Sequence, residues 1–323
     1  MAFHFLVVFA LLQVSHGGAV MPEEAYWKSL FPNNPMPKAL KDILPKSFNA
    51  PTYLRGGYGS GYGHSSKEFH APNYVWGSYG DGHDDPSKEF KRETISLEGN
   101  VALLNETTFF FQEDLRTGKL VNLPRLATTS DKTPFFPNQI AETMPFSSDK
   151  LPEIVNNLSL KPQTREAGVV NETIRGCERA AIDGEQKFCA TSFESFIDSS
   201  VSKLGKQIQL LSSVLSKETK NPLFTIVKGM ENMGENELIC HKMEYPGAVF
   251  MCHSINKTVV YKVPLVSGDG TQANALVVCH KDTWNWNPKH LAFRVLKVKP
   301  GTGPICHFLG RDTLVWVSSS TTK

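Results

Sequence analysis

The chain has 323 residues, 40% of them hydrophobic and 20% charged, so it can bury a substantial core in one large domain or two smaller ones. Its formal net charge of +2 lacks the basic field of a nucleic-acid-binding protein. Beyond the N-terminus no stretch approaches the roughly 18 apolar residues of a membrane span. We therefore expect a soluble protein with neither nucleic acid nor membrane as a partner.

The first nineteen residues, MAFHFLVVFALLQVSHGGA, predict a secretory signal peptide, because an apolar run is followed by small residues up to Ala19. The alternative is an apolar N-terminal strand or helix. A secreted chain would enter an oxidising compartment and end in the vacuole, the apoplast or the cell wall, with its six cysteines paired as disulfides. Secretion also makes four Asn-x-Ser/Thr sequons candidate glycosylation sites: Asn105, Asn157, Asn171 and Asn256.

Residues 20–50 predict a short N-terminal segment whose prolines leave one helical turn at 38–44. Residues 51–92 are rich in Gly, Tyr, Ser, His and Asp and poor in aliphatic side chains. Such a segment cannot bury enough apolar surface to offset its ordering entropy, so we expect disorder there. It contains a loose duplication, YGHSSKEF and YGDGHDDPSKEF, on either side of a stretch that holds Trp76.

A globular domain is expected over residues 109–323. TTFFFQEDL predicts a strand, and DKLPEIVNNLSL predicts a short helix capped by Ser148 or Asp149. Apolar residues at helical spacing predict one amphipathic helix over 186–204 that ends at Gly205. Strand-like runs then follow, separated by turn signals such as GDGT and PGTGP: LFTIVKGM, GAVFMCH, TVVYKVPLVS, NALVVCH, LAFRVLKV, PICHFL and LVWVS. The expected class is α+β, with a helical part before a mostly antiparallel, disulfide-stapled β half.

Four Cys-His dipeptides stand out in this β half: Cys240-His241, Cys252-His253, Cys279-His280 and Cys306-His307. Neighbouring side chains on a strand point to opposite faces. A Cys-His dipeptide therefore sends its sulfur one way and its imidazole the other. Four such dipeptides could place cysteines in the core, bridging strands, and gather the histidines on the other side.

Three roles are open to these histidines. A structural zinc site would need Cys-x-x-Cys or His-x-x-x-His spacings and reduced thiolates, neither of which is expected in this chain. A buried, hydrogen-bonded structural role is the plain alternative for some of the four. A polyhistidine copper site is the sharper hypothesis, because imidazoles suit Cu(II) and the cysteines would be consumed as disulfides.

The spacing of the dipeptides resembles the defining pattern of the plant BURP domain. Ten residues separate the first pair of dipeptides, and twenty-five residues separate each of the next two. FFFQEDLRTGKLVNLP, LPRLATTSDKTPFFPNQIAETMPFSSDKLPEI and CHFLGRDTLVWV are also similar to that family, as is YWKSLFPNNPMPKALKDILP near the N-terminus. The resemblance covers about 109–317 and 26–45. Cys177 and Cys189 are then expected to form a local disulfide, which leaves Cys240, Cys252, Cys279 and Cys306 for two bridges in the β half.

The resemblance implies two different functions. Some members of the family are described as non-enzymatic seed, stress or wall-associated proteins, which implies a cell-wall polysaccharide or a wall enzyme as the partner. Others are copper-dependent peptide cyclases that join a Tyr or Trp side chain to another residue of a core peptide, often in their own chain. In a cyclase of this kind, copper (Cu2+) would be bound by His241, His253, His280 and His307, with dioxygen as the oxidant.

The segment upstream of the domain favours the cyclase among these two functions. HAPNYVWGSYGDG offers an oxidisable aromatic side chain in a tethered segment, with Asn73, Tyr74, Trp76 and Tyr79 as candidate core residues. Long valine-glycine repeats and repeated Phe-x-x-Tyr arrays, which mark two non-catalytic types in the family, are absent from the sequence. The alternative is that residues 51–92 are only a spacer.

Other enzyme classes find little support in the sequence. GYGSG around Ser60 has Tyr58 where a nucleophile elbow needs Gly, and no Walker loop is present. Oxidised cysteines cannot act as nucleophiles.

Overall fold

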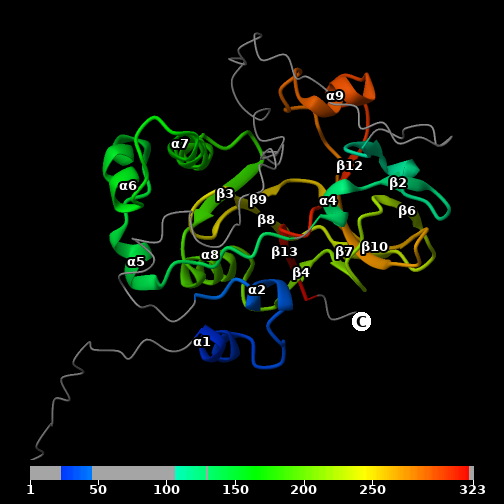
Figure 1. Cartoon of the computed structure of the whole chain (residues 1–323). Helices are drawn as coiled ribbons and strands as arrows, with labels where there is room; N and C mark the ends of the chain where they lie inside the picture. Colours follow the sequence, from blue (N-terminus) through cyan, green and yellow to red (C-terminus); the bar gives the residue numbers. More distant parts are fainter. Residues whose placement is uncertain (1–22, 46–105, 129, 320–323) are drawn as a thin grey trace, which may run out of the picture.

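The computed structural model describes residues 23–45, 106–128 and 130–319. The predicted signal peptide, the segment 51–92 with its core candidates Asn73, Tyr74, Trp76 and Tyr79, and the sequon at Asn105 lie outside these residues. Within them, most helices precede residue 205 and most strands follow it, so the predicted α+β class is confirmed (Figure 1). No helix in the described ranges has the length and apolar character to cross a membrane.

The helices are short, and most lie on one side of the β structure. The α-helices are α1 (Glu23–Leu30), α2 (Lys38–Lys41), α4 (Pro124–Ala127), α5 (Asn138–Thr143), α6 (Leu151–Asn157), α7 (Arg165–Glu178), α8 (Phe193–Leu204) and α9 (Leu291–Leu296). Two turns of 3-10 helix accompany them, η2 (Gln112–Asp114) and η3 (Ser148–Lys150).

Two antiparallel sheets carry the strands. The larger sheet has the order β1-β12-β11-β10-β6-β2, with β5 paired to β11 and β7 paired to β10. The smaller has the order β3-β9-β8-β13-β4. The larger sheet consists of β1 (Phe110–Phe111), β2 (Leu120–Asn122), β5 (Val214–Leu215), β6 (Leu223–Ile226), β7 (Glu231–Gly234), β10 (Thr258–Ser267), β11 (Gln272–His280) and β12 (Ile305–Phe308). The smaller consists of β3 (Glu185–Ala190), β4 (Ile208–Ser212), β8 (Glu237–Met243), β9 (Val249–Ile255) and β13 (Leu314–Ser318).

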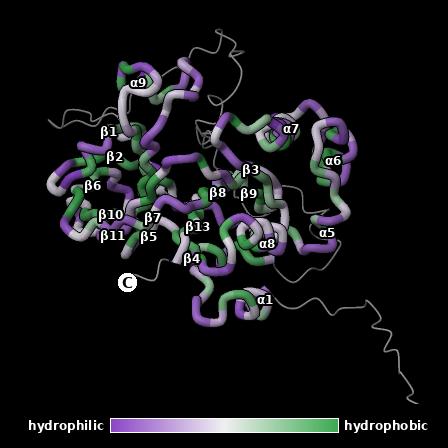
Figure 2. Tube along the Cα trace, turned by 180° about the vertical axis from the view of Figure 1, so that it is seen from behind, coloured by the Kyte–Doolittle hydropathy of each residue, from purple (hydrophilic) through white to green (hydrophobic). Residues whose placement is uncertain are grey.

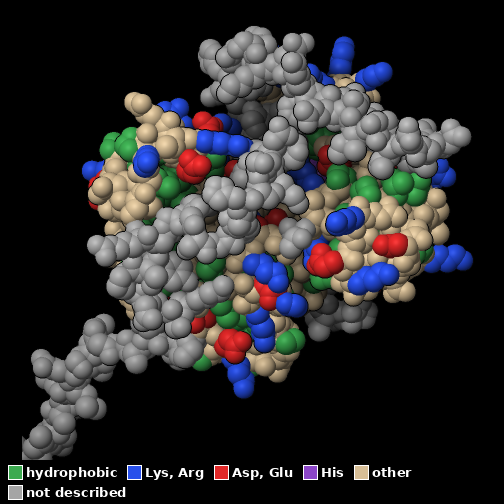
Figure 3. All heavy atoms as spheres, viewed as in Figure 1, with side chains coloured by type: hydrophobic (Ala, Val, Ile, Leu, Met, Phe, Trp, Pro, Cys, Tyr) green, Lys and Arg blue, Asp and Glu red, His purple; other side chains and the backbone are tan. Residues whose placement is uncertain are grey.

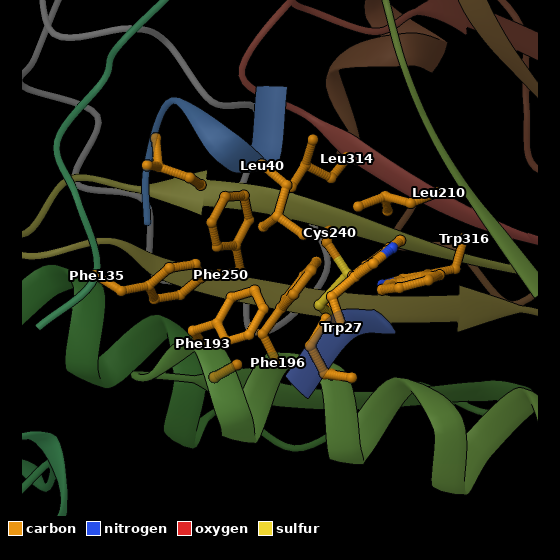
Figure 4. Packing of buried hydrophobic residues seen from close by; sticks show 14 of the residues in the cluster. Trp27, Leu40, Phe135, Phe193, Phe196, Leu210, Cys240, Phe250, Leu314 and Trp316 are labelled. Carbon is orange, nitrogen blue, oxygen red and sulfur yellow. A yellow bond between two sulfur atoms is a disulfide. The ribbon is translucent and has the colours of Figure 1, made fainter. Parts of the chain in front are cut away.

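An aromatic core covers the outer face of the smaller sheet (Figure 4). Trp27 of α1 and Phe196 of α8 each contact Trp316 of β13, with ring centroids 5.7 Å apart in both pairs. Cys240 is buried in the same cluster. The predicted N-terminal segment was expected to hold only one helical turn, at 38–44. Its described residues, 23–45, contain two helices, α1 and α2, and pack onto the domain through them.

A second apolar layer lies between the two sheets. It joins Ile239, Val315 and Val317 of the smaller sheet to Val260 and Leu276 of the larger one. The hydropathy-coloured trace shows hydrophobic stretches along the central strands and hydrophilic ones toward the periphery (Figure 2). Each sheet therefore has an outer face with its own core and an inner face turned toward the other sheet.

The helix predicted over 186–204 is shorter than expected. Residues 185–190 form β3, whose Phe188 and Ala190 pack into the aromatic core at alternate positions. Ser192 adopts the extended backbone of an N-cap and exchanges side-chain hydrogen bonds with Ser195, so α8 cannot extend before it. The stop at Gly205 is confirmed, with φ of +79°. The sequence reading also missed α7.

Two further local predictions were wrong. LAFRVLKV was predicted as a strand but contains α9, because His290 caps the helix and Ala292 and Phe293 turn one face into a small core with Trp286. Neither Ser148 nor Asp149 caps α6; these two residues belong to η3, and Lys150 holds the N-cap position without a side-chain bond.

All six cysteines are paired, as predicted. Cys177 at the end of α7 is bonded to Cys189, which lies on β3 rather than inside a helix. Cys240–Cys252 joins β8 to β9, and Cys279–Cys306 joins β11 to β12. Each sheet thus carries one cross-strand bridge between two adjacent Cys-His strands.

Candidate metal centre

The four Cys-His dipeptides lie on β8, β9, β11 and β12, where strand alternation separates their side chains. The sulfurs of both cross-strand bridges are buried in the outer cores of the two sheets. Ile239, two residues before His241, and Val278, two residues before His280, pack in the layer between the sheets. Because alternate residues share a face, the imidazoles are directed to the inner side while the sulfurs staple the outer side.

The histidines form two diagonal pairs. On β8 and β9, Cys240 stands opposite Cys252, whereas His241 stands opposite Met251, so the ring of His253 is its diagonal neighbour. The centroids of these two rings are 5.4 Å apart. The same arrangement recurs on β11 and β12, where the rings of His280 and His307 are 5.7 Å apart.

Both pairs line one pocket with a cavity volume of about 170 Å³. An engineered cavity of about 150 Å³ accommodates benzene, so this pocket has room for one aromatic ring. Phe109, at the start of the described domain, also lines it and contacts His307 edge-on, with centroids 5.8 Å apart. The structure therefore brings together all four histidines that the sequence singled out.

Burial keeps most of these histidines neutral. Desolvation, followed by the charges of neighbouring histidines, holds the pKa of His241 and of His280 well below the usual value. Desolvation lowers the pKa of His307 to about 4, although a hydrogen bond to the Phe308 carbonyl opposes the shift. A neutral imidazole is the form that ligates a metal ion, so these side chains are ready to act as ligands at neutral pH.

Two buried groups orient the histidines from behind. Nδ1 of His253 lies 2.9 Å from Oε1 of Glu185, on the neighbouring edge strand β3. Nδ1 of His280 lies 2.9 Å from the Thr258 hydroxyl, directly across the β10–β11 ladder. In the tautomer of His253 that donates its Nδ1 proton to this carboxylate, Nε2 carries the lone pair that can bind a metal ion. A carboxylate behind the ring is the usual arrangement for a metal-ligating histidine.

Sequence reasoning missed a fifth histidine in this pocket and a tryptophan that packs against two of its histidines. His290 is 1% exposed and lines the pocket, and its Nδ1 accepts a hydrogen bond from the Ala292 amide. Desolvation lowers its pKa to about 4. Trp286 lies between the rings of His280 and His290, at centroid distances of 4.9 and 4.6 Å. The only sequence signal for these two residues was their position between the last two Cys-His dipeptides. That segment forms a wall of the pocket.

The donor chemistry fits a copper ion, and each pair of rings is close enough to share one. Two imidazoles whose nitrogens lie about 2 Å from one ion have ring centroids roughly 4.5–6.5 Å apart. Both observed separations fall in this range. In the described part of the chain, however, no group of three or more His, Cys, Asp or Glu side chains is arranged to hold a metal ion. Within each pair the two rings already have a spacing that suits a shared ion. A metal site that uses all four rings is a proposal.

Charged residues surround the pocket at its edge. Arg125, Arg311 and Asp312 line it, together with Glu106, the first residue of the described domain. Arg311 donates two hydrogen bonds to the Glu218 carboxylate. Since Glu106 is a lining residue, the second described range begins at the pocket.

The three sequons inside the described ranges differ in position. Asn256 is exposed in the turn between β9 and β10, whereas Asn157 and Asn171 are half-buried on α6 and α7. Their glycosylation stays a prediction.

Comparison with known proteins shows to which family this domain belongs. The BURP domain family model matches residues 108–318. The BURP domain protein RD22 of Arabidopsis thaliana is 44% identical over 222 residues, which cover 66% of this chain and 56% of RD22. The rice BURP domain-containing protein 3 is 43% identical over 67% of this chain and 51% of its own length. This chain thus spans about half the length of these two relatives. The rice BURP domain-containing protein 5 is 37% identical over 92% of this chain and 87% of its own length.

Proposed function

The chain belongs to the BURP domain family, and on that premise we propose that it is a copper-dependent peptide cyclase acting on a core peptide in its own upstream segment. The observation that carries the proposal is the convergence of two imidazole pairs, one from each sheet, on a single pocket. A purely structural role would not require histidines from both sheets to face the same cavity. Passage through the secretory pathway belongs to the same proposal, because the three disulfides suit an oxidising compartment.

The proposal gives each group a role. His241, His253, His280 and His307 would hold the ion, and Glu185 and Thr258 would keep two of these rings in place. Bound copper with dioxygen would supply the two one-electron oxidations that link a Tyr or Trp side chain to another residue of the core. The new bond removes two hydrogen atoms from the peptide, and dioxygen accepts the electrons and protons. The pocket would hold the aromatic ring and exclude competing water.

The position of Glu106 supports action in cis. Candidate residue Trp76 precedes Glu106 by thirty residues, a tether that spans at most about 100 Å when fully extended. A short tether of this kind supplies the core at an effective concentration on the order of millimolar. Asn73, Tyr74, Trp76 and Tyr79 can all therefore reach a pocket at which their own chain enters the domain.

Peptide mass tests this function directly. Metal-free full-length protein would be incubated with Cu(II) in air and digested, and the peptide containing residues 70–83 would be weighed. A loss of about 2 Da for each new bond, the mass of two hydrogen atoms, supports cyclisation. Trp76→Ala and Tyr79→Phe would show which ring is joined. An unchanged peptide mass with copper bound would reject the cyclase and support the non-catalytic secreted or wall-associated role.

A further inference from the structure

The segment between β11 and β12, residues 281–304, forms a lobe that includes α9. On its inner side, His290 lines the histidine pocket and Trp286 packs against the ring of His280. Its outer side carries four exposed basic residues: Lys289, Arg294, Lys297 and Lys299. We call residues 281–304 the α9 lobe. It is therefore both a wall of the pocket and the carrier of a basic surface.

The positive charge of the α9 lobe is not balanced within it. Its one acidic residue, Asp282, is paired with Lys257 on the β9–β10 turn, and Lys281 is paired with Glu235. Within the described ranges the four outer cations take part in no ion pair. Elsewhere, acidic and basic side chains are interspersed on the face seen in Figure 3, whereas blue side chains project at the top, where Figure 1 places α9. With a net charge of +2 for the whole chain, this is a local concentration of charge.

An exposed indole lies on the same lobe. Trp284 is 73% exposed, the largest exposure among the large hydrophobic residues of the described chain. Its ring lies against Gly301, where an added Cβ would come within 2.5 Å of the indole. Its backbone amide also donates to Asp282. An indole held on the same lobe as these cations forms a surface suited to an anionic partner that can also pack against an aromatic face.

The chain itself contains a matching partner. Between Lys67 and Lys88 it has no Lys or Arg, and its acidic residues are Glu68, Asp81, Asp84 and Asp85. The three aspartates follow Tyr79 by two to six residues. That distance corresponds to about 7–20 Å of extended chain, enough to run from the pocket onto its outer wall.

We propose that the α9 lobe docks residues 80–85, GDGHDD, of its own chain and thereby positions the aromatic residues just before them over the histidine pocket. The naming of those residues as a core rests on the proposed cyclase function, whereas the docking is an electrostatic contact that exists without copper. An intramolecular partner is favoured over an external polyanion because the same chain re-enters the domain at Glu106, beside the pocket.

Photocrosslinking of the full-length, copper-free chain tests the docking independently of any cyclisation. His83 would be replaced by p-benzoylphenylalanine, which attaches to whatever lies beside it on irradiation. We expect crosslinks within the same chain to peptides from residues 281–304, with a yield that falls as salt is raised. Lys289→Glu/Arg294→Glu/Lys297→Glu/Lys299→Glu should lower the yield roughly tenfold, because attraction becomes repulsion.

A matched control reverses four exposed lysines outside the α9 lobe, Lys150→Glu/Lys161→Glu/Lys206→Glu/Lys220→Glu, and should leave the yield unchanged. Adding Asp81→Lys/Asp84→Lys/Asp85→Lys to the reversed lobe should restore crosslinking. Equal loss in both reversed variants, crosslinks located away from the lobe, or crosslinks only between two chains would overturn the proposal. So would an unaffected crosslink in the lobe variant. If the docking is shown but Cu(II) and air leave the peptide mass unchanged, the cyclase function fails and the docking stands.

Discussion

Oε1 of Glu185 lies 2.9 Å from Nδ1 of His253, and the two side chains are only 4% and 6% exposed. Burial opposes ionisation of this carboxyl group, but hydrogen bonds from His253 and from the Ile182 amide outweigh it and keep the pKa of Glu185 below its usual value. The carboxylate is therefore charged at neutral pH and is placed to fix the orientation of one imidazole of the pocket.

Removing this carboxylate should weaken copper binding. We expect Glu185→Ala to lower the affinity for Cu(II) by about 10–100-fold, and Glu185→Gln, which still accepts a hydrogen bond, by less. Competition with a chelator of known affinity measures the change. Gln186→Ala, at the exposed neighbouring position of β3, is the control. Equal affinity in Glu185→Ala and Gln186→Ala would show that the carboxylate does not act on a metal ligand.

Two of the disulfides allow the effect of a bridge on stability to be separated from its effect on the position of the metal ligands. Cys240–Cys252 and Cys177–Cys189 both span a sequence separation of 12, so their loop-closure contributions should be alike, about 2–4 kcal/mol each. Replacing either pair by serine should lower the denaturation midpoint similarly. Only Cys240→Ser/Cys252→Ser should also lower copper affinity, because it loosens the strands that carry His241 and His253. A parallel loss of affinity in both double variants would argue against this placement role.

Glu237 predicts a stability change at high pH. It is 2% exposed, and desolvation raises its pKa to about 8, while Oε2 has no hydrogen-bond partner among the described residues. A carboxyl group whose pKa is raised by folding stabilises the protein below its unfolded pKa of about 4.5, and this contribution is lost as pH rises through 8. Glu237→Gln should therefore match the wild type near pH 4.5 and exceed it by about 1–3 kcal/mol at pH 9 in denaturant unfolding. Parallel pH profiles would contradict the assignment.

His290 should contribute to acid sensitivity in the metal-free protein. Its folded pKa of about 4 lies below the ordinary value of 6.5, so unfolding takes up a proton between these two pH values. The neutral side chain thus supports the fold fully above pH 6.5, and this support is lost as pH falls toward 4. His290→Gln should reduce the drop in unfolding midpoint between pH 7 and pH 4. A profile as steep as that of the wild type would assign the acid sensitivity to other groups.

The strand pattern explains why the main features of the site could be predicted from sequence. Alternation on a strand separates sulfur from imidazole whatever the pairing, so the dipeptides at 240–241 and 279–280 predicted both the staples and the shared face. The number of cysteines in an oxidising compartment then predicted complete pairing. The gathering of the histidines on one side was predicted in this way, whereas their arrangement as two diagonal ring pairs follows from the strand pairing.

The partners of the histidines could not be predicted in this way. Glu185 is 68 residues from His253 in sequence, and only the pairing of β3 with β9 brings them together. LAFRVLKV has enough β-branched and aromatic residues for a strand, but the cap at His290 and the contact of Phe293 with Trp286 select a helix. These tertiary contacts override local propensity.

The most direct test of the metal centre is electron paramagnetic resonance of Cu(II) in the full-length chain, combined with metal analysis. The account predicts stoichiometric copper with splitting from several nitrogen ligands. His253→Ala/His280→Ala, which removes one imidazole from each pair, should lose both, with His253→Gln/His280→Gln as a second variant should the first unfold. Stoichiometric copper with an unchanged spectrum in a folded double variant would contradict the account.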